Sequence, residues 1–399
     1  MGTRLEYNSK DSSIAFLMSL VAPLLIGSVA VMLLKGFFPA IDDTTYYYVA
    51  LSINQLVFLG CFLVYNKITK TNIKSACRVK FNLNFLQIII VIAIGLVAMY
   101  GFSSLVDYMG YVLSQLGYTS TSFSFLKLSN FGMFLLSVFV VAVMPAFCEE
   151  SLFRGIALNG LRKKGEWTAI VISGLMFCIM HLSIEQSIYQ FVLGMVLSSV
   201  VVITGSILSS MILHFFNNFY ILLLSFIAQG STTETPVTTT YTTVIDHILP
   251  FLLAIVSVIV IYLLLVLLKK CTKNCECKAF SFENWSKNAK KTNIDSIVPQ
   301  QDNNLENSQN SLTKNCQEIE KNQVITIVDE NSSQNSSDSN AKLLNKEKQS
   351  DVEQNALTTK SESINQTNTQ KKPDLFLILS LLFGAFLWIV MVVAQFFVN

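Results

Sequence analysis

Long apolar runs separated by short polar stretches constrain this chain more than any other feature. A helix needs roughly 20 apolar residues to cross a bilayer, where every backbone polar group must be satisfied within the protein. Charged residues make up only 14% of the chain, whereas a soluble domain carries about a quarter. The sequence therefore predicts an all-α, polytopic membrane helix bundle of about nine spans. These spans are expected near 14–36, 45–65, 84–106, 131–153, 167–184, 187–204, 206–228, 248–268 and 375–397.

Lysine and arginine crowd one set of connections between these runs, and such connections face the cytoplasm by the positive-inside rule. The loop 229–247 contains neither residue type. With nine spans, we expect the N-terminus on the cytoplasmic side of the cell membrane and the loop 229–247 and the C-terminus outside. The basic connections contain Lys67, Lys70, Lys74, Arg78, Lys80, Arg162, Lys163, Lys164, Lys269, Lys270 and Lys273.

The composition changes completely near residue 274. Residues 274–373 are rich in Asn, Ser, Gln, Lys and Glu, so they cannot bury enough apolar area to offset the entropy of ordering. We expect a disordered cytoplasmic linker before a last helix, and we expect the tail 274–399 to be dispensable for chemistry. The predicted domains are N-terminal helices with a cytoplasmic loop at 1–83, a core at 84–268, the linker at 269–373 and a C-terminal transmembrane helix at 374–399.

Three short patterns place ionisable side chains inside the apolar runs. Such groups are expensive in hydrocarbon, so they usually mark a functional site there. The chain has three histidines, and two of them fall in these patterns. A buried catalytic site is therefore the first hypothesis. The patterns are Glu149-Glu150-x-x-x-Arg154, Phe177-x-x-x-His181 and His214-x-x-x-Asn218.

Helical spacing indicates how these groups can cooperate. Residues four apart share a helix face, so Glu150 and Arg154 can pair while Glu149 points about 100° away toward a cavity. Glu149 and His181 each lie about fifteen residues from the basic turn near 163–166, so antiparallel helices can bring them level. Phe177 lies one turn before His181, so its ring can pack against the imidazole.

These groups suit hydrolysis by an activated water. Glu149 can take a proton from a water that His181 helps to orient. His214 and Asn218 share a helix face and can both donate hydrogen bonds to an oxyanion. The sequence contains neither G-x-S-x-G nor H-E-x-x-H, the motifs of a serine nucleophile elbow and a zinc protease.

The ordered set of patterns resembles the CAAX-protease and bacteriocin-processing family of intramembrane endopeptidases, whose motifs are E-E-x-x-x-R, F-x-x-x-H and H-x-x-x-N/D. The match covers about 131–228, within a core of about 84–268. The resemblance implies a CAAX-type (type II) endopeptidase with catalytic Glu149. It implies support from Glu150 and Arg154, a water-activating His181, and an oxyanion site at His214 and Asn218. Family members cleave near the C-terminus of prenylated proteins, or process or confer immunity to peptides in bacteria.

The cofactor and the partners are less constrained by the sequence. Glu149, His181 and His214 are candidate ligands for a divalent metal such as zinc, and the family is often labelled metalloprotease. Direct activation by Glu and His needs no metal and is favoured. The expected partners are membrane lipid and a membrane-bound protein or peptide substrate. The net charge of +2 argues against nucleic acid, and the oligomeric state is not indicated.

Two other functional classes fit parts of the sequence. A non-catalytic membrane scaffold or bacteriocin-immunity protein could keep the same fold and motifs. A proton-coupled transporter could also use buried Glu, Arg and His side chains as a proton relay. Transporters are often built from internal repeats, and the two halves of this chain share no duplicated polar motif.

Overall fold

The computed structural model describes residues 3–118, 128, 130–229, 241–273, 275, 277–280 and 373–397. Contacts divide the chain into two units, Met1–Ser281 with Asp374–Asn399, and Phe282–Pro373. The expected linker 269–373 lies almost wholly outside the described residues, so its disorder stays a prediction. The first unit is described below.

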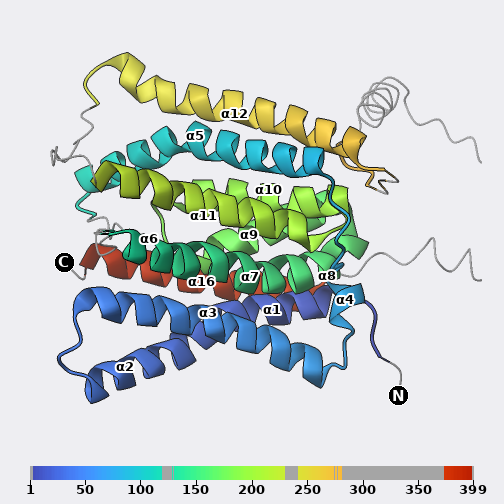
Figure 1. The fold of residues 1–399 in the computed structure, drawn as a ribbon, viewed down its shortest axis with the longest axis horizontal. Coiled ribbons are helices and arrows are strands. Elements are labelled where there is room, and N and C mark those ends of the chain that lie inside the picture. The colour runs from blue at the N-terminus through green and yellow to red at the C-terminus, as the bar shows by residue number, and fades with distance from the viewer. Residues whose placement is uncertain are drawn as a thin grey trace, which may run out of the picture. The chain divides into compact units, whose positions relative to one another are not determined.

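The described residues form helices, with one isolated bridge between Arg4 and Thr71 as their only strand-like pairing (Figure 1). Eight helical stretches in this part of the chain are long and apolar enough to cross a membrane. The expected all-α, polytopic membrane bundle is therefore confirmed. The stretches are Ser9–Phe37, Asp43–Ile68, Phe85–Gln115, Phe131–Lys164, Ser187–Thr204, Ile207–Ala228, Val244–Cys271 and Leu375–Phe396.

The run expected to span at 167–184 forms a shorter helix. Helix α9, Glu166–Met180, has 15 residues, which corresponds to about 22 Å against a hydrocarbon thickness of about 30 Å. His181 caps the helix, and Leu182 has a left-handed backbone with φ +50°. The apolar run continues past this point, but the helix does not.

Helices α10, Ser187–Thr204, and α11, Ile207–Gln229, are separate, as the sequence predicts. Gly205 ends α10 with φ +67°, a conformation that favours glycine because it has no Cβ. Two apolar helices can therefore follow each other with almost no loop.

The span 131–164 is one long rod with two π-helical segments. A π-helical turn is rare, changes the hydrogen-bond register and often accompanies a functional site. Side chains satisfy carbonyls of the second segment: Ser12 donates to Ala157 at 2.7 Å, and Asn159 donates to Arg154 at 2.9 Å. The rod consists of α6 (Phe131–Ser137), η2 (π, Val138–Val143), α7 (Met144–Glu150), η3 (π, Ser151–Leu158), α8 (Asn159–Leu161) and η4 (Arg162–Lys164).

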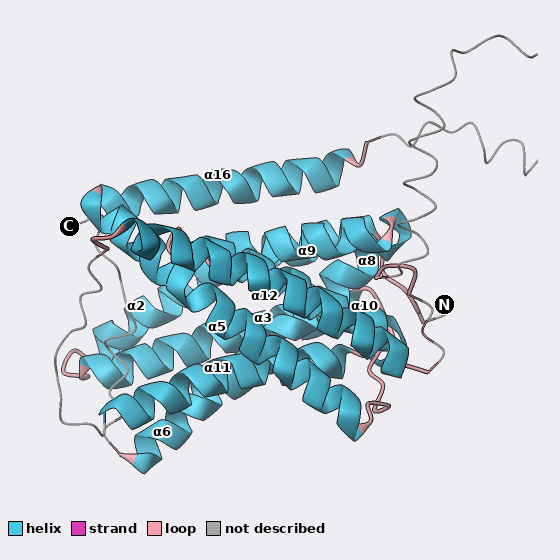
Figure 2. Ribbon diagram, turned by 90° about the horizontal axis from the view of Figure 1, so that it is seen from above, coloured by secondary structure: helices cyan, strands magenta, loops and turns pink. Residues whose placement is uncertain are grey.

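The helices pack so that this rod is covered on several sides. Figure 1 shows α5 beside α12, with α9, α10 and α11 in the middle of the view, and Figure 2 shows the same helices from above. Helix α11 contacts η2 and α7, α3 contacts α7, and α1 contacts η3. The rod's polar residues are therefore enclosed by helices from both halves of the first unit. The bounds of the newly named helices are α1 Ser9–Ala22, α3 Asp43–Ile68, α5 Phe85–Gln115 and α12 Val244–Cys271.

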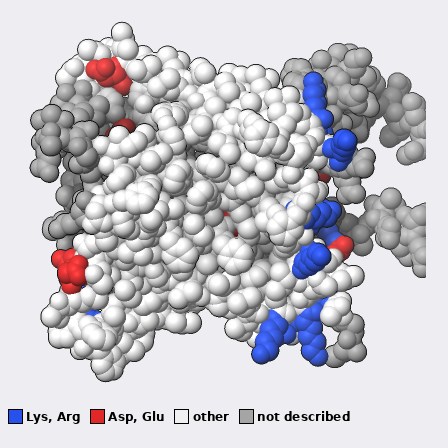
Figure 3. Space-filling view, viewed as in Figure 1, with Lys and Arg blue, Asp and Glu red and all other residues white. Residues whose placement is uncertain are grey.

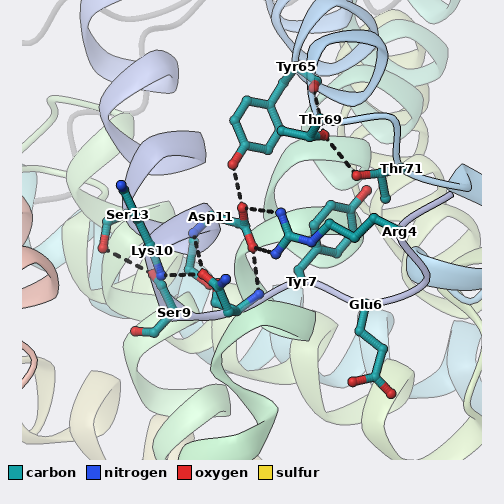
Figure 4. A network of polar contacts seen from close by, with 12 residues as sticks. Arg4, Glu6, Tyr7, Ser9, Lys10, Asp11, Ser13, Tyr65, Thr69 and Thr71 are labelled. Carbon is teal, nitrogen blue, oxygen red and sulfur yellow. Dashed lines mark hydrogen bonds and ion pairs between the residues drawn. The ribbon is translucent and has the colours of Figure 1, made fainter. Parts of the chain in front are cut away.

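A polar clasp fixes the N-terminal segment against α3 (Figure 4). The Arg4 guanidinium pairs with the Asp11 carboxylate, and the Tyr65 hydroxyl donates to the same carboxylate. Two backbone hydrogen bonds add to it: Arg4 N–H donates to the Lys70 carbonyl at 3.0 Å, and Asn72 N–H donates to the Arg4 carbonyl at 2.8 Å. The start of α1 is therefore fixed before the helix enters the bundle.

The last helix, α16 (Leu375–Phe397), packs directly on α1 and α9. Gly384 permits the close approach, because a Cβ there would lie 2.5 Å from the Phe16 ring. At the start of α16, Lys164 Nζ lies 3.0 Å from Asp374 Oδ2. Glu166 accepts hydrogen bonds from the Lys278 and Ala279 backbones at 2.8 and 2.7 Å. The residues on both sides of the linker are therefore anchored near the same turn.

We expect the linker and α16 to differ in their effect on stability. Replacing 282–372 with about ten flexible Gly and Ser residues should leave the melting temperature in detergent unchanged, because both anchors remain. Ending the chain at Gln370 should lower the melting temperature by several degrees, because α16 covers apolar surface of α1 and α9. Equal melting temperatures for the two variants would contradict the prediction that α16, and not the linker, contributes to stability.

Candidate active site

The two adjacent glutamates lie at the junction of α7 and η3, and both are buried. Glu150 Oε1 accepts a hydrogen bond from Arg154 Nη1 at 2.8 Å. It also accepts one from His214 Nδ1 on α11 at 2.9 Å. The expected pairing of Glu150 with Arg154 is thus present, and His214 joins it from a helix 64 residues further along the chain.

Arg154 is fully buried and reaches a third helix. Its Nη2 donates to the Gly194 carbonyl of α10 at 3.0 Å. Its guanidinium carbon lies 4.5 Å from the centre of the Phe177 ring, within the range of a cation–π contact. A buried charge needs this density of partners, because leaving it unpaired is strongly destabilising.

Phe177 occupies the centre of the cluster. Its ring centre lies 4.6 Å from that of His181 and 5.8 Å from that of His214, both in edge-to-face geometry. Phe177 therefore contacts both imidazoles and the guanidinium, whereas the sequence predicted only its contact with His181. The Phe177 ring thus contributes to the apolar surroundings of an ion pair that is fully buried.

His181 lies at the C-terminal end of α9 with its Nδ1 2.8 Å from the Phe177 carbonyl. A carbonyl only accepts, so Nδ1 carries the hydrogen and Nε2 of the neutral ring has a free lone pair. His181 lies within electrostatic range of Glu149, Arg154 and His214. The structure therefore brings five predicted polar residues together around Phe177: Glu149, Glu150, Arg154, His181 and His214.

Glu149 makes a contact that the sequence analysis missed. Its Oε1 accepts a hydrogen bond from Gln55 Nε2 on α3 at 2.8 Å. Its Oε2 is buried and has no hydrogen-bond partner in the protein. Glu149 is thus held by one neutral amide, whereas Glu150 bonds to Arg154 and His214 through one oxygen, and its Oε2 is likewise buried without a partner.

Asn218 lies on α11 one turn after His214, but its side chain already has partners. Its Nδ2 donates to the Val141 carbonyl of η2 at 2.8 Å, and its Oδ1 accepts from Asn217 Nδ2 at 3.1 Å. One hydrogen on Nδ2 remains for a ligand, because an amide nitrogen carries two. Asn217 also accepts a hydrogen bond from the Tyr189 hydroxyl.

The candidate metal ligands do not form a metal site. Among the described residues, no group of three His, Cys, Asp or Glu side chains is arranged to hold a metal ion. Nδ1 of His214 is bonded to Glu150, and Nδ1 of His181 is bonded to the Phe177 backbone. Zinc sites in enzymes use three protein ligands and one water. In both rings the bonded nitrogen is Nδ1, which leaves Nε2 available, and a ligating histidine typically bonds through its other nitrogen in this way.

Residues 131–220 match the family model described as Rce1-like, type II CAAX prenyl endopeptidase Rce1-like. The match includes all three patterns and confirms the resemblance that they indicate. It covers less than a quarter of the chain and excludes α3, which supplies Gln55. No curated protein and no solved structure matches the chain.

Arg154 should be the residue on which the stability of this cluster depends. We expect Arg154→Ala to cost about 3–5 kcal/mol of unfolding free energy, because Glu150 then loses a cation inside the bundle. Glu6→Gln is the matched control, because it breaks an exposed ion pair with Lys163 and should change nothing measurable. Thermal unfolding of both purified variants in detergent gives the comparison. An Arg154→Ala protein as stable as the control would show that the pair contributes little.

Proposed function

We propose that this protein is an intramembrane endopeptidase that hydrolyses peptide bonds of membrane-associated proteins or peptides. The observation that carries the proposal is the different setting of two adjacent acids. Glu150 bonds to the buried Arg154 guanidinium and to His214, whereas Glu149 bonds to the neutral amide of Gln55. A carboxylate held by a neutral amide suits a general base. The family match over 131–220 supports the same reaction class.

The first step is attack by water. Glu149 Oε2 takes one hydrogen of the water, and Nε2 of His181 accepts a hydrogen bond that orients it. The water oxygen bonds to the peptide carbonyl carbon, and the electron pair of the C=O bond moves to the carbonyl oxygen. This produces a tetrahedral intermediate with one negative charge and a protonated Glu149.

The second requirement is a donor pair for the oxyanion. With Nδ1 of His214 bonded to Glu150, protonation places a second hydrogen on Nε2, and Glu150 stabilises that imidazolium. Asn218 retains one amide hydrogen beyond its bond to Val141. Two such donors in a water-poor site stabilise the charge that develops there. The C–N bond then breaks, and the proton on Glu149 passes to the leaving amine.

The substrate class follows from the family description and from the surroundings of the site. The matched family is named for prenyl endopeptidases that act on CAAX sequences. A prenylated C-terminus carries its own membrane anchor, and a site built among eight candidate spans of the described part suits a substrate held in the same membrane. We propose prenylated or otherwise membrane-anchored peptides as substrates, cleaved near their C-terminus.

Glu149→Gln should nearly abolish cleavage of a fluorogenic, prenylated CAAX peptide, because it removes the base and conserves the shape. His181→Ala should do the same, because it orients the same water. Asn218→Ala should reduce kcat by about 10²–10³, the effect of losing one oxyanion donor. Stopped assays in detergent micelles provide the rates.

Circular dichroism of each variant excludes misfolding, and Glu6→Gln is the active control. If Glu149→Gln cleaves like the wild type while folded Glu150→Gln does not, the two acids exchange roles. If both variants cleave normally, the hydrolytic mechanism is wrong. A scaffold or immunity protein would keep its cellular function in Glu149→Gln, which separates those classes from a protease.

We also propose that the basic end of the bundle faces the cytoplasm of the cell. Figure 3 shows that most lysine and arginine side chains on this face gather at the end where α4 (Ile73–Ala76) and α8 lie. Positively charged connections remain on the cytoplasmic side of a membrane. The charge distribution in space therefore supports the orientation expected from the sequence.

Cysteine labelling in intact cells tests this orientation. Thr238→Cys should react with a membrane-impermeant maleimide, and Ser336→Cys should react only after the cells are opened. Both positions lie outside the described residues, so the prediction rests on the charge distribution alone. Labelling of Ser336→Cys in intact cells, with Thr238→Cys protected, would reverse the orientation.

A further inference from the structure

Gln55 reaches the candidate base from a helix that the family match does not include. It lies on α3, Asp43–Ile68, and the match begins at residue 131. Helix α3 packs on α7, and Gln55 is only 8% exposed. A polar side chain on a buried helix face requires an explanation, because unsatisfied polar groups are costly there. The buried residues of α3 are Tyr48, Gln55, Phe58, Phe62 and Asn66.

The chemistry of the two groups fixes the direction of their hydrogen bond. A carboxylate oxygen accepts, so the amide nitrogen of Gln55 faces Oε1 of Glu149, as in the 2.8 Å contact. The amide oxygen of Gln55 then has no partner in the protein, like Oε2 of Glu149. The two bonded groups therefore have one free acceptor each, and both acceptors are buried.

We propose that Gln55 is a positioning residue for Glu149. This inference rests on the proposed function of the site. The amide of Gln55 holds Oε1, so Oε2 is the oxygen that accepts the proton. The other hydrogen of the water is donated to Nε2 of His181, which leaves a water lone pair directed at the substrate carbonyl. One O–H bond of the water breaks, its proton goes to Oε2, and the other O–H bond stays intact.

A merely structural role would give Gln55 a different signature. Tyr48 provides the comparison, because it lies on the same buried face of α3 and hydrogen-bonds to Ser137 of the rod. Removing either bond should cost some stability. Only the bond to Glu149 should also affect the protonation of the base, because a hydrogen bond to a carboxylate favours its ionised form.

The experiment compares Gln55→Leu, Gln55→Glu and Tyr48→Phe with the wild type in the prenylated CAAX peptide assay. Gln55→Leu should lower kcat by about 10²-fold, because a misplaced reacting group loses a factor of that size. Its KM should change little, and the acidic limb of its pH profile should move to higher pH. Tyr48→Phe should keep the wild-type kcat and pH profile.

Gln55→Glu should recover part of the activity within a narrow pH range. When the two carboxyl groups share one proton, Glu at position 55 can donate to Glu149 as the amide does. At higher pH both ionise and repel each other, so the activity should fall where the wild type is still active. A variant with a purely structural defect would not produce this narrowed profile.

Infrared difference spectra give a readout that does not depend on any substrate. The carboxylate band that is present in the wild type and absent in Glu149→Gln reports the ionisation of Glu149. In Gln55→Leu this band should appear at higher pH than in the wild type. The same spectra can be recorded for Gln55→Glu if Gln55→Leu does not fold.

The outcomes distinguish this inference from the proposed function. If Glu149→Gln is inactive while Gln55→Leu keeps the wild-type kcat, pH profile and infrared titration, Gln55 is not a positioning residue. A Gln55→Leu protein with lower stability and unchanged kinetics would also overturn the inference. If Glu149→Gln cleaves normally, the proposed mechanism itself fails.

Discussion

The buried ion pair between Glu150 and Arg154 is the interaction on which the rest of the site depends. A charge inside a helix bundle is tolerated only when paired and hydrogen-bonded, so each partner restricts the helices that supply it. Arg154 also bonds to the Gly194 carbonyl of α10, and Glu150 also bonds to His214 of α11. Phe177 of α9 covers the guanidinium. One ion pair thereby fixes the positions of three further helices.

The same pair explains how two adjacent acids come to differ. Adjacent residues on a helix point about 100° apart, so Glu150 faces α11 while Glu149 faces α3. Glu150 bonds to a guanidinium and an imidazole, and Glu149 bonds to one neutral amide. Gln55 therefore holds Glu149 in place without the counter-charge that Arg154 gives to Glu150.

The sequence predicts the local part of this arrangement well. The four-residue spacing of Glu150 and Arg154 correctly indicates their pairing, because helix geometry determines which residues share a face. The bond between Glu150 and His214 is not predictable in the same way, since it depends on how α11 rotates and slides against the rod. The π-helical segments also have no pattern in the sequence that distinguishes them from ordinary helix. Each π-helical turn changes the hydrogen-bond register of the rod, so the side chains around the site point in directions that a regular α-helix would not give them.

Gln55 shows why a lone polar residue is easily missed. Its signal in the sequence is an amide inside an apolar run, and a polar residue there can equally join two helices. The signal becomes informative only when Gln55 is taken with Tyr48 and Asn66, which lie on the same buried face. Their bonds to Glu149, Ser137 and Tyr7 show that this face meets three different polar partners. The face is visible in the sequence, but the partners are not.

The early end of α9 explains how His181 obtains its orientation. The last turn tightens, so that the His181 N–H bonds to the Cys178 carbonyl at 3.2 Å instead of the Phe177 carbonyl. The Phe177 carbonyl is then free to accept from Nδ1 of His181, as a helix end leaves its last carbonyls without backbone donors. Had α9 continued for the full span predicted at 167–184, that carbonyl would also accept the backbone N–H of His181. The shorter helix thus sets the tautomer that leaves Nε2 available, and the interruption of an apolar run is part of the chemistry of the site.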